Sequence, residues 1–147
     1  MAGKIGVVST TEVALAAATA KTIVQLIAPT NYSLKIKEWG VYFDGISTTA
    51  EPVQVRLLKQ TTAGTMSSLT PALRKGSAAV QSTAQHTATV EPTAAAVMAV
   101  REVHPQSGYQ EKFAFGDEIE LLSAERIGIE CTAPAIVNVR GEIVFEE

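Results

Sequence analysis

The sequence predicts an all-β fold, an antiparallel two-sheet sandwich of the jelly-roll type with an extended N-terminal arm. From residue 22 onward β-branched residues dominate, and turn-forming residues recur about every ten positions, as in sandwiches and barrels. No long amphipathic helical pattern interrupts them. The spacing gives about eight to ten short strands, enough for two packed antiparallel sheets. Strand counting leaves an immunoglobulin-like sandwich as an alternative, although the Cys, Trp and Cys spacing of that family is absent.

Length and composition indicate one domain. The chain has 147 residues, 46% of them hydrophobic, which suffices for a single core, and we divide it into an arm, residues 1–21, and a sandwich, residues 22–147. A net charge of -3 and the lack of a basic run argue against nucleic acid as a partner. No apolar run approaches the roughly 20 residues of a membrane-spanning helix. Residues 9–12 also interrupt the apolar stretch that a signal peptide needs, so we expect no membrane partner.

The arm is rich in Ala, Thr and Gly and shows no sustained period of helix or strand. It still carries Ile5, Val7, Val8, Val13 and Leu15, too many apolar side chains for a solvated tail. We expect it to reach away from its own sandwich and to add a strand to another subunit or lie along a partner surface. Ile5, Val7 and Val8 are the predicted partner-binding residues. The alternatives are a short helix near residues 12–18 and a disordered tail.

The first two strands of the sandwich are defined by the parity of their apolar residues. Residues 22–28 are apolar on both parities, which predicts a strand buried on both sides. In the next strand the apolar parity switches between Ile36 and Trp39. A strand cannot turn its side chains over without an extra residue, so we place a β-bulge near Lys37 and Glu38.

Turn residues separate the remaining segments. Asp44 with Gly45 predicts a tight turn, and residues 53–57 alternate as a half-buried strand does. Residues 65–70 fit a short strand, and residues 71–76, with Pro early and Gly late, fit one helical turn. We expect a loop at residues 77–83 and strands at residues 85–90, 97–103, 109–115, 118–121, 126–132 and 137–145.

Few residues offer metal or nucleophilic chemistry. His86 and His104 are the two histidines, and they lie far apart in the sequence without neighbouring ligands, so we expect no metal site. Cys131 is the single cysteine and cannot close an internal disulfide. Its neighbours Ile127 and Ile129 predict a buried, unreactive thiol. We therefore expect neither a catalytic centre nor a cofactor.

Acidic and aromatic residues are the remaining candidates. A pair of carboxylates is the pattern of a glycoside hydrolase, but alternation favours a solvated strand face here. The single tryptophan, Trp39, shares an apolar parity with Val41 and Phe43, which favours core packing over sugar stacking. Tyr109 is the other aromatic candidate for a sugar platform. The acidic residues concerned are Glu118, Glu120, Glu125 and Glu130.

The apolar content also predicts self-association. Residues 22–28 are apolar on both parities, and further apolar side chains crowd the last strand, which exceeds what one small sandwich hides. We therefore expect a homo-oligomer. The residues of the last strand concerned are Ile136, Val137, Val139 and Val144.

Several strings of the sequence are suggestive of one protein family. They are APTN (28–31), IKEWGV (36–41), FDG (43–45), TAEPV (49–53), QTTAGT (60–65), TATVEPT (87–93), VHPQSG (103–108) and ERIGIECTAP (125–134). In these strings the chain resembles small virion proteins of tailed bacteriophages and prophages. The resemblance covers roughly residues 22–147 and leaves the arm unmatched.

The resemblance implies a jelly-roll head decoration, or cement, protein. Such a protein is made in the host cytoplasm, binds itself and the major capsid protein, and sits on the outer capsid surface of the virion, often as a trimer. The family brings no catalytic residues and no cofactor. The runner-up is a carbohydrate- or receptor-binding jelly-roll module of a phage fibre or baseplate, and an enzyme comes third.

Overall fold

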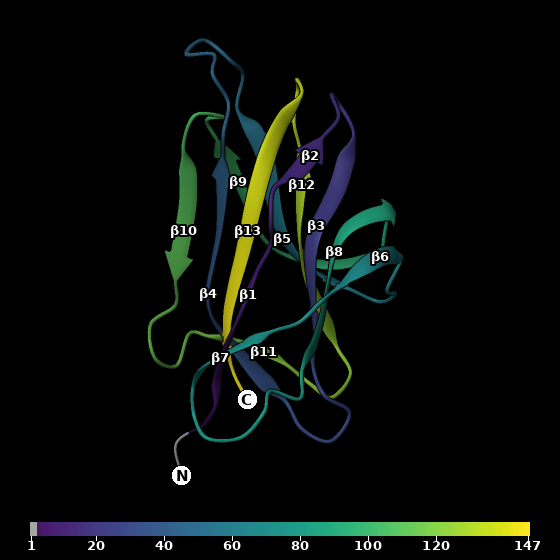
Figure 1. Cartoon of the computed structure of the whole chain (residues 1–147), viewed down its shortest axis with the longest axis vertical. Helices are drawn as coiled ribbons and strands as arrows, with labels where there is room; N and C mark the ends of the chain where they lie inside the picture. Colours follow the sequence, from purple (N-terminus) through teal and green to yellow (C-terminus); the bar gives the residue numbers. More distant parts are fainter. Residues whose placement is uncertain (1–2) are drawn as a thin grey trace.

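The computed structural model describes residues 3–147 and shows the predicted all-β, two-sheet sandwich (Figure 1). Thirteen strands form a 7-stranded and a 6-stranded sheet, and every pair of strands is antiparallel. Residues 3–147 contain no helix, and therefore no helix that is long and apolar enough to cross a membrane. Met1 and Ala2, the first residues of the predicted arm, lie outside the described part.

The first sheet has the order β10-β4-β13-β1-β7, with β11 also against β4 and β2 also against β13. Its strands are β1 (Ile5–Ser9), β2 (Val13–Leu15), β4 (Leu34–Phe43), β7 (Ala72–Lys75), β10 (Gly108–Lys112), β11 (Ile119–Leu121) and β13 (Val137–Glu146). The second sheet has the order β6-β8-β3-β12-β5-β9. Its strands are β3 (Ala20–Ile27), β5 (Val53–Gln60), β6 (Thr65–Leu69), β8 (Thr83–Val90), β9 (Ala94–Val103) and β12 (Arg126–Thr132).

The strand pairing is nested along the chain. β1 pairs with β13, β3 with β12, β4 with β10 and β5 with β9, so the first half of the chain runs antiparallel to the second half. Rolling up this long hairpin brings β13 against β4 and β12 against β5. The strands β6, β7 and β8, inserted between β5 and β9, extend the sheets beyond β3 and β1.

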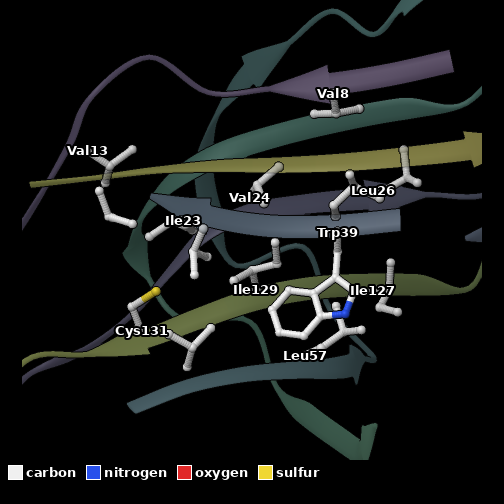
Figure 2. Close-up of a cluster of buried hydrophobic side chains, with 14 of the residues drawn as sticks. Val8, Val13, Ile23, Val24, Leu26, Trp39, Leu57, Ile127, Ile129 and Cys131 are labelled. Carbon is white, nitrogen blue, oxygen red and sulfur yellow. The ribbon is translucent and has the colours of Figure 1, made fainter. Parts of the chain in front are cut away.

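The core between the sheets follows the period-two alternation of the strands. Ile127, Ile129 and Cys131 on β12 are fully buried, and so is the indole of Trp39 on β4. These residues belong to one hydrophobic cluster that also includes Val8 of β1 (Figure 2). The predictions of a buried Cys131 and a core-packed Trp39 are therefore confirmed.

The bulge predicted in β4 is present. Glu38 faces Val144 of β13 and Ile36 faces Phe145, so Lys37 is an extra residue without a partner in β13. A second bulge explains the apolar residues of β3. There Ile23 is the extra residue, and both Ile23 and its neighbour Val24 are buried in the core.

The expectation that residues 1–21 form an arm reaching away from the sandwich is wrong for the described part of that segment. Ile5–Ser9 forms β1, which lies between β13 and β7 in the first sheet, and Val13–Leu15 forms β2 against the other half of β13. The helix alternative for residues 12–18 is also wrong. The physical reason is that β13 would otherwise expose an unpaired edge, so its main-chain hydrogen-bonding groups select this segment as their partner.

Two further local expectations are corrected by long-range pairing. Ala72–Lys75 forms strand β7 beside β1, where a helical turn was expected from Pro71 and Gly76. Asp44 and Gly45 do not close a hairpin. They begin a crossing loop, residues 44–52, because β4 and β5 belong to opposite sheets. Residues typical of helix ends and turns indicate only a local conformational preference. Pairing with the free edge of β1 overrides that preference in β7.

The place of β1 in the sheet is tested by truncating its two neighbouring valines. Val8 is fully buried and Val7 is half-buried on the outward face. Val8→Ala is expected to lower the free energy of unfolding by about 1.5–3 kcal/mol, because it leaves a core cavity. The matched control Val7→Ala is expected to cost less than about 1 kcal/mol. Urea unfolding followed by the fluorescence of Trp39 measures both, and equally small losses would place β1 outside the sandwich.

Candidate functional site

A cluster of aromatic and charged side chains joins the edges of the two sheets. Arg101 of β9 donates from Nε to the hydroxyl of Tyr109 on β10 at 2.9 Å, and its guanidinium carbon lies 5.5 Å from the ring centroid. The ring of Tyr109 packs against Trp39 at 5.4 Å between centroids and 51° between planes. Nε1 of Trp39 donates to Glu111 at 3.1 Å, and Glu111 also pairs with Arg101 at 3.4 Å. We call these four residues the seam cluster.

Neither aromatic candidate, Trp39 or Tyr109, offers an open stacking surface in the seam cluster. Trp39 is fully buried, and Tyr109 is half-buried between Trp39 and Arg101. Sugar binding by stacking needs an aromatic face open to solvent. The cluster instead links β9 and β10, which are not neighbours in either sheet, through side chains.

The four acidic candidates do not converge on one another. Each carboxylate has its own partner: Glu118 pairs with Lys37 at 2.8 Å, Glu125 with Lys59 at 3.0 Å and Glu130 with Arg56, whereas Glu120 accepts from Ser33 at 3.2 Å. A glycoside hydrolase needs two carboxylates facing one bond. Single ion pairs at Glu118, Glu125 and Glu130 therefore fit the structure better than a catalytic pair. The predicted solvated face is wrong for Glu130, which is buried, and for the covered side chain of Glu118, because each carboxylate packs against its cationic partner.

Glu118 is the most strongly perturbed of these carboxylates. Its side chain is 3% exposed. The ammonium of Lys37, together with the backbone amides of Glu118 itself and of Gly116, lowers the pKa of the carboxyl to about 2. A general acid needs a raised pKa, so this shift indicates a structural ion pair.

The two histidines and the cysteine lie apart from one another. Nδ1 of His86 lies 2.9 Å from the hydroxyl of Thr87, and Nδ1 of His104 accepts from the backbone amide of Gln106 at 3.1 Å. Within residues 3–147 no group of three or more His, Cys, Asp or Glu side chains could hold a metal ion. Burial, and next to it the charge of Glu130, raises the pKa of the Cys131 thiol, which makes it a poor nucleophile.

A buried polar chain that sequence reasoning missed lies on the second sheet. Gln25 donates to Gln60 at 2.7 Å, Gln60 donates to the hydroxyl of Thr22 at 3.0 Å, and Thr22 donates from its hydroxyl and its amide to Glu91 at 2.7 and 2.9 Å. A side chain at Gly128 would occupy the position of the Gln60 amide. The one sequence signal was Gln25 within an otherwise apolar run. Because each donor finds an acceptor, the chain fixes the residues before β9 onto β3.

Exposed apolar side chains gather on strand β9. It is the last strand of the second sheet, and the segment 93–100 contains no charged residue. Val97, Met98 and Val100 are 45%, 40% and 45% exposed. Residues 94–96, all alanine, are exposed as well. We call residues 94–100 the β9 surface.

A second apolar region lies at the end of the sandwich that is at the top of Figure 1. There a groove of about 470 Å³ opens between the crossing loop 44–52 and the β12–β13 turn. The exposed side chains of Ile46 and Ile136 stand at it, and Pro105 and Pro134 contribute to its lining. Glu51 is the one ionisable residue of the lining.

The predicted partner-binding residues are divided by the structure. Val8 belongs to the core, whereas Ile5 and Val7 alternate with it and lie half-buried on the outward face of the first sheet. The residues from which self-association was predicted are divided in the same way. Ile136 is exposed, and Val137 and Val139 are buried in the core. Val144 lies on the outward face of the first sheet, where its neighbours leave it 3% exposed.

A comparison with models of known protein families finds no match, and a comparison with curated protein sequences finds no significant match. The function is therefore argued from the surfaces described above.

The Lys37–Glu118 ion pair predicts an acid-dependent loss of stability. The folded-state pKa of Glu118 is about 2, below its ordinary value of 4.5. Its stabilising contribution is therefore complete above about pH 4.5 and is lost as the pH falls toward 2. Glu118→Gln is expected to flatten this part of the profile of unfolding free energy against pH. Glu120→Gln, which removes an exposed carboxylate that forms no ion pair within residues 3–147, is the control and should leave the profile unchanged.

Proposed function

We propose that the chain is a non-enzymatic structural protein of a phage virion, which decorates and stabilises the outer capsid surface as a homo-oligomer, with a trimer as the preferred state. The observation that carries the proposal is the β9 surface. A further element of the proposal is that the sandwich is a jelly roll. The nested pairing of β1 with β13, β3 with β12, β4 with β10 and β5 with β9 supports this topology.

The β9 surface has the character of a contact surface. Edge strands of monomeric proteins usually carry charges or proline that prevent further association. The segment 93–100 has neither, and three of its larger apolar side chains are substantially exposed. Its pairing with β5 shifts register twice, which bends the strand. We therefore infer that it docks through side chains and not by adding a regular strand, and that another protein surface covers it in the assembled state.

The paired state of the ionisable groups supports a role without catalysis. Glu118, Glu125 and Glu130 each bind one cation, and the thiol of Cys131 is buried. Catalytic sites instead leave activated groups facing a cleft. A carbohydrate-binding function finds less support, because Trp39 and Tyr109 are both covered in the seam cluster.

Light scattering and electron microscopy test the proposal. At micromolar concentration the protein should have a mass that is a multiple of 15.5 kDa, and particles of the phage that encodes it should carry knobs on their shells. Val97→Lys with Val100→Lys should leave the fold intact, since both side chains are exposed, and should weaken attachment at least tenfold by burying charge.

The matched control for the β9 surface is Thr70→Lys with Ser77→Lys, which adds the same charges at exposed positions away from β9. A monomer of 15.5 kDa at micromolar concentration would contradict the oligomer. Particles that lack the protein, or unchanged attachment of the β9 variant, would contradict the decorating role.

A further inference from the structure

A second groove, of about 400 Å³, lies on the outward face of the first sheet where β1 begins and β13 ends. Its floor is apolar and consists of Ile5 from β1 and Val144 from β13. Lys37 and Glu38 of β4 line it on one side, at the bulge. We call it the basic groove, for the cations described next.

The basic groove concentrates positive charge in an acidic chain. Besides Lys37 it is lined by Arg74 and Lys75 of β7 and by Lys112 of β10. Arg74, Lys75 and Lys112 are exposed and take part in no ion pair within residues 3–147. Lys37 is already neutralised by two carboxylates. Three cations and one carboxylate, Glu38, thus line the groove without an ion pair in residues 3–147, which leaves an excess of positive charge, although the whole chain has a net charge of -3.

Residues 115–117, which we call the knob, have the complementary chemistry. Phe115 is 94% exposed. Gly116 has a φ of +97°, and apart from its chain neighbours nothing in residues 3–147 lies within 4 Å of the position of a Cβ, so the tip projects from the sandwich. Asp117 is exposed and forms no ion pair within the described residues. The knob thus presents an aromatic ring beside a free carboxylate.

The knob is fixed next to the basic groove without filling it. Glu118, the residue after the knob, binds Lys37 at 2.8 Å, and the backbone amide of Phe113 donates to the carbonyl of Lys37 at 2.9 Å. The ring of Phe115 nevertheless remains exposed, so it does not occupy the groove of its own chain. The knob of a second copy carries the same ring and carboxylate, and its contacts with its own Lys37 do not restrict how it approaches this groove.

The lining of the basic groove favours an apolar side chain with a carboxylate over a nucleic acid. It contains no aromatic residue on which a base stacks. Three free cations are few for a backbone that carries a phosphate at every step. An apolar floor of Ile5 and Val144 instead suits a hydrophobic ring.

We propose that the knob of one copy binds the basic groove of the next, with Phe115 on the floor and Asp117 facing Arg74, Lys75 and Lys112. This inference rests on the homo-oligomer of the proposed function and names its interface. One knob buries too little area for a stable contact, which needs about 800 Å² per partner. Each copy offers one knob and one groove, so every copy makes two such contacts in a closed assembly.

Sedimentation velocity of wild type and variants tests the interface. Phe115→Ser should weaken association about 10- to 100-fold, which corresponds to the loss of one buried aromatic side chain. Arg74→Glu with Lys75→Glu should weaken it at least tenfold through like-charge repulsion with Asp117. Adding Asp117→Lys to this double variant restores opposite charges and should recover most of the association. All substituted side chains are exposed, and the fluorescence of the buried Trp39 verifies that each variant is folded.

Leu122→Ser is the matched control, because it removes an exposed apolar side chain that lies outside the knob and lines neither the basic groove nor the end groove. It should leave association unchanged. A wild-type protein that is monomeric contradicts the proposed oligomer itself. A wild-type oligomer that persists in Phe115→Ser, or fails to be rescued by Asp117→Lys, overturns only the knob-and-groove interface. A further outcome is that the Phe115→Ser variant stays oligomeric and its groove binds a short DNA duplex. This result would assign the groove to a polyanion and would also overturn the knob-and-groove interface.

Discussion

The pairing of β13 with strands from distant parts of the chain is the constraint on which the rest of the structure depends. β13 lies inside the first sheet, with β4 on one side and β1 and β2 sharing the other. Buried main-chain amides and carbonyls must be hydrogen-bonded, so this central strand requires a partner along both edges. The N-terminal segment supplies the second edge, and in doing so it delivers Val8, Val13 and Leu15 to the core. The nested pairs β3 with β12, β4 with β10 and β5 with β9 follow the same pattern, in which an early strand pairs with a late one.

Side-chain contacts join segments of the two sheets that main-chain pairing does not connect. The seam cluster links β9 to β10, where no main-chain pairing exists, through Arg101 and Glu111. The bulge at Lys37 frees that side chain from the alternation of β4, and its ammonium reaches Glu118 and Glu146. On the second sheet the chain from Gln25 to Glu91 ties the entrance of β9 to β3. Most of the charged and polar residues that drew attention in the sequence are therefore engaged in holding the sandwich together.

The functional proposal rests on the contrast between polar groups that are paired within the sandwich and apolar side chains that remain exposed. Ionisable groups bound to single partners have little capacity for acid–base or nucleophilic chemistry. What the molecule leaves available is apolar surface: the β9 surface, the end groove beside Ile46, and the knob with its exposed ring. Such surfaces are suited to contact with other proteins, and three of them at different places allow one chain to bind both its own copies and a larger partner. The basic groove adds an excess of positive charge, which favours a partner surface that carries negative charge.

Features that depend on local alternation could be predicted from the amino-acid sequence. The all-β class, the burial of Trp39 and Cys131 and the bulge at Lys37 all follow from which parity is apolar. Which strands pair with one another could not be predicted from the sequence. The main-chain hydrogen-bonding groups along a strand edge are the same for every sequence, so pairing depends on which edges the folded chain leaves free. Hence β1 and β7 were misassigned, and Ile5, Val7 and Val8 could not be separated into surface and core. The exposure of β9 and of Phe115 could not be predicted for the same reason, because the packing of the whole chain sets which apolar strand lies at an edge and which loop projects from the sandwich.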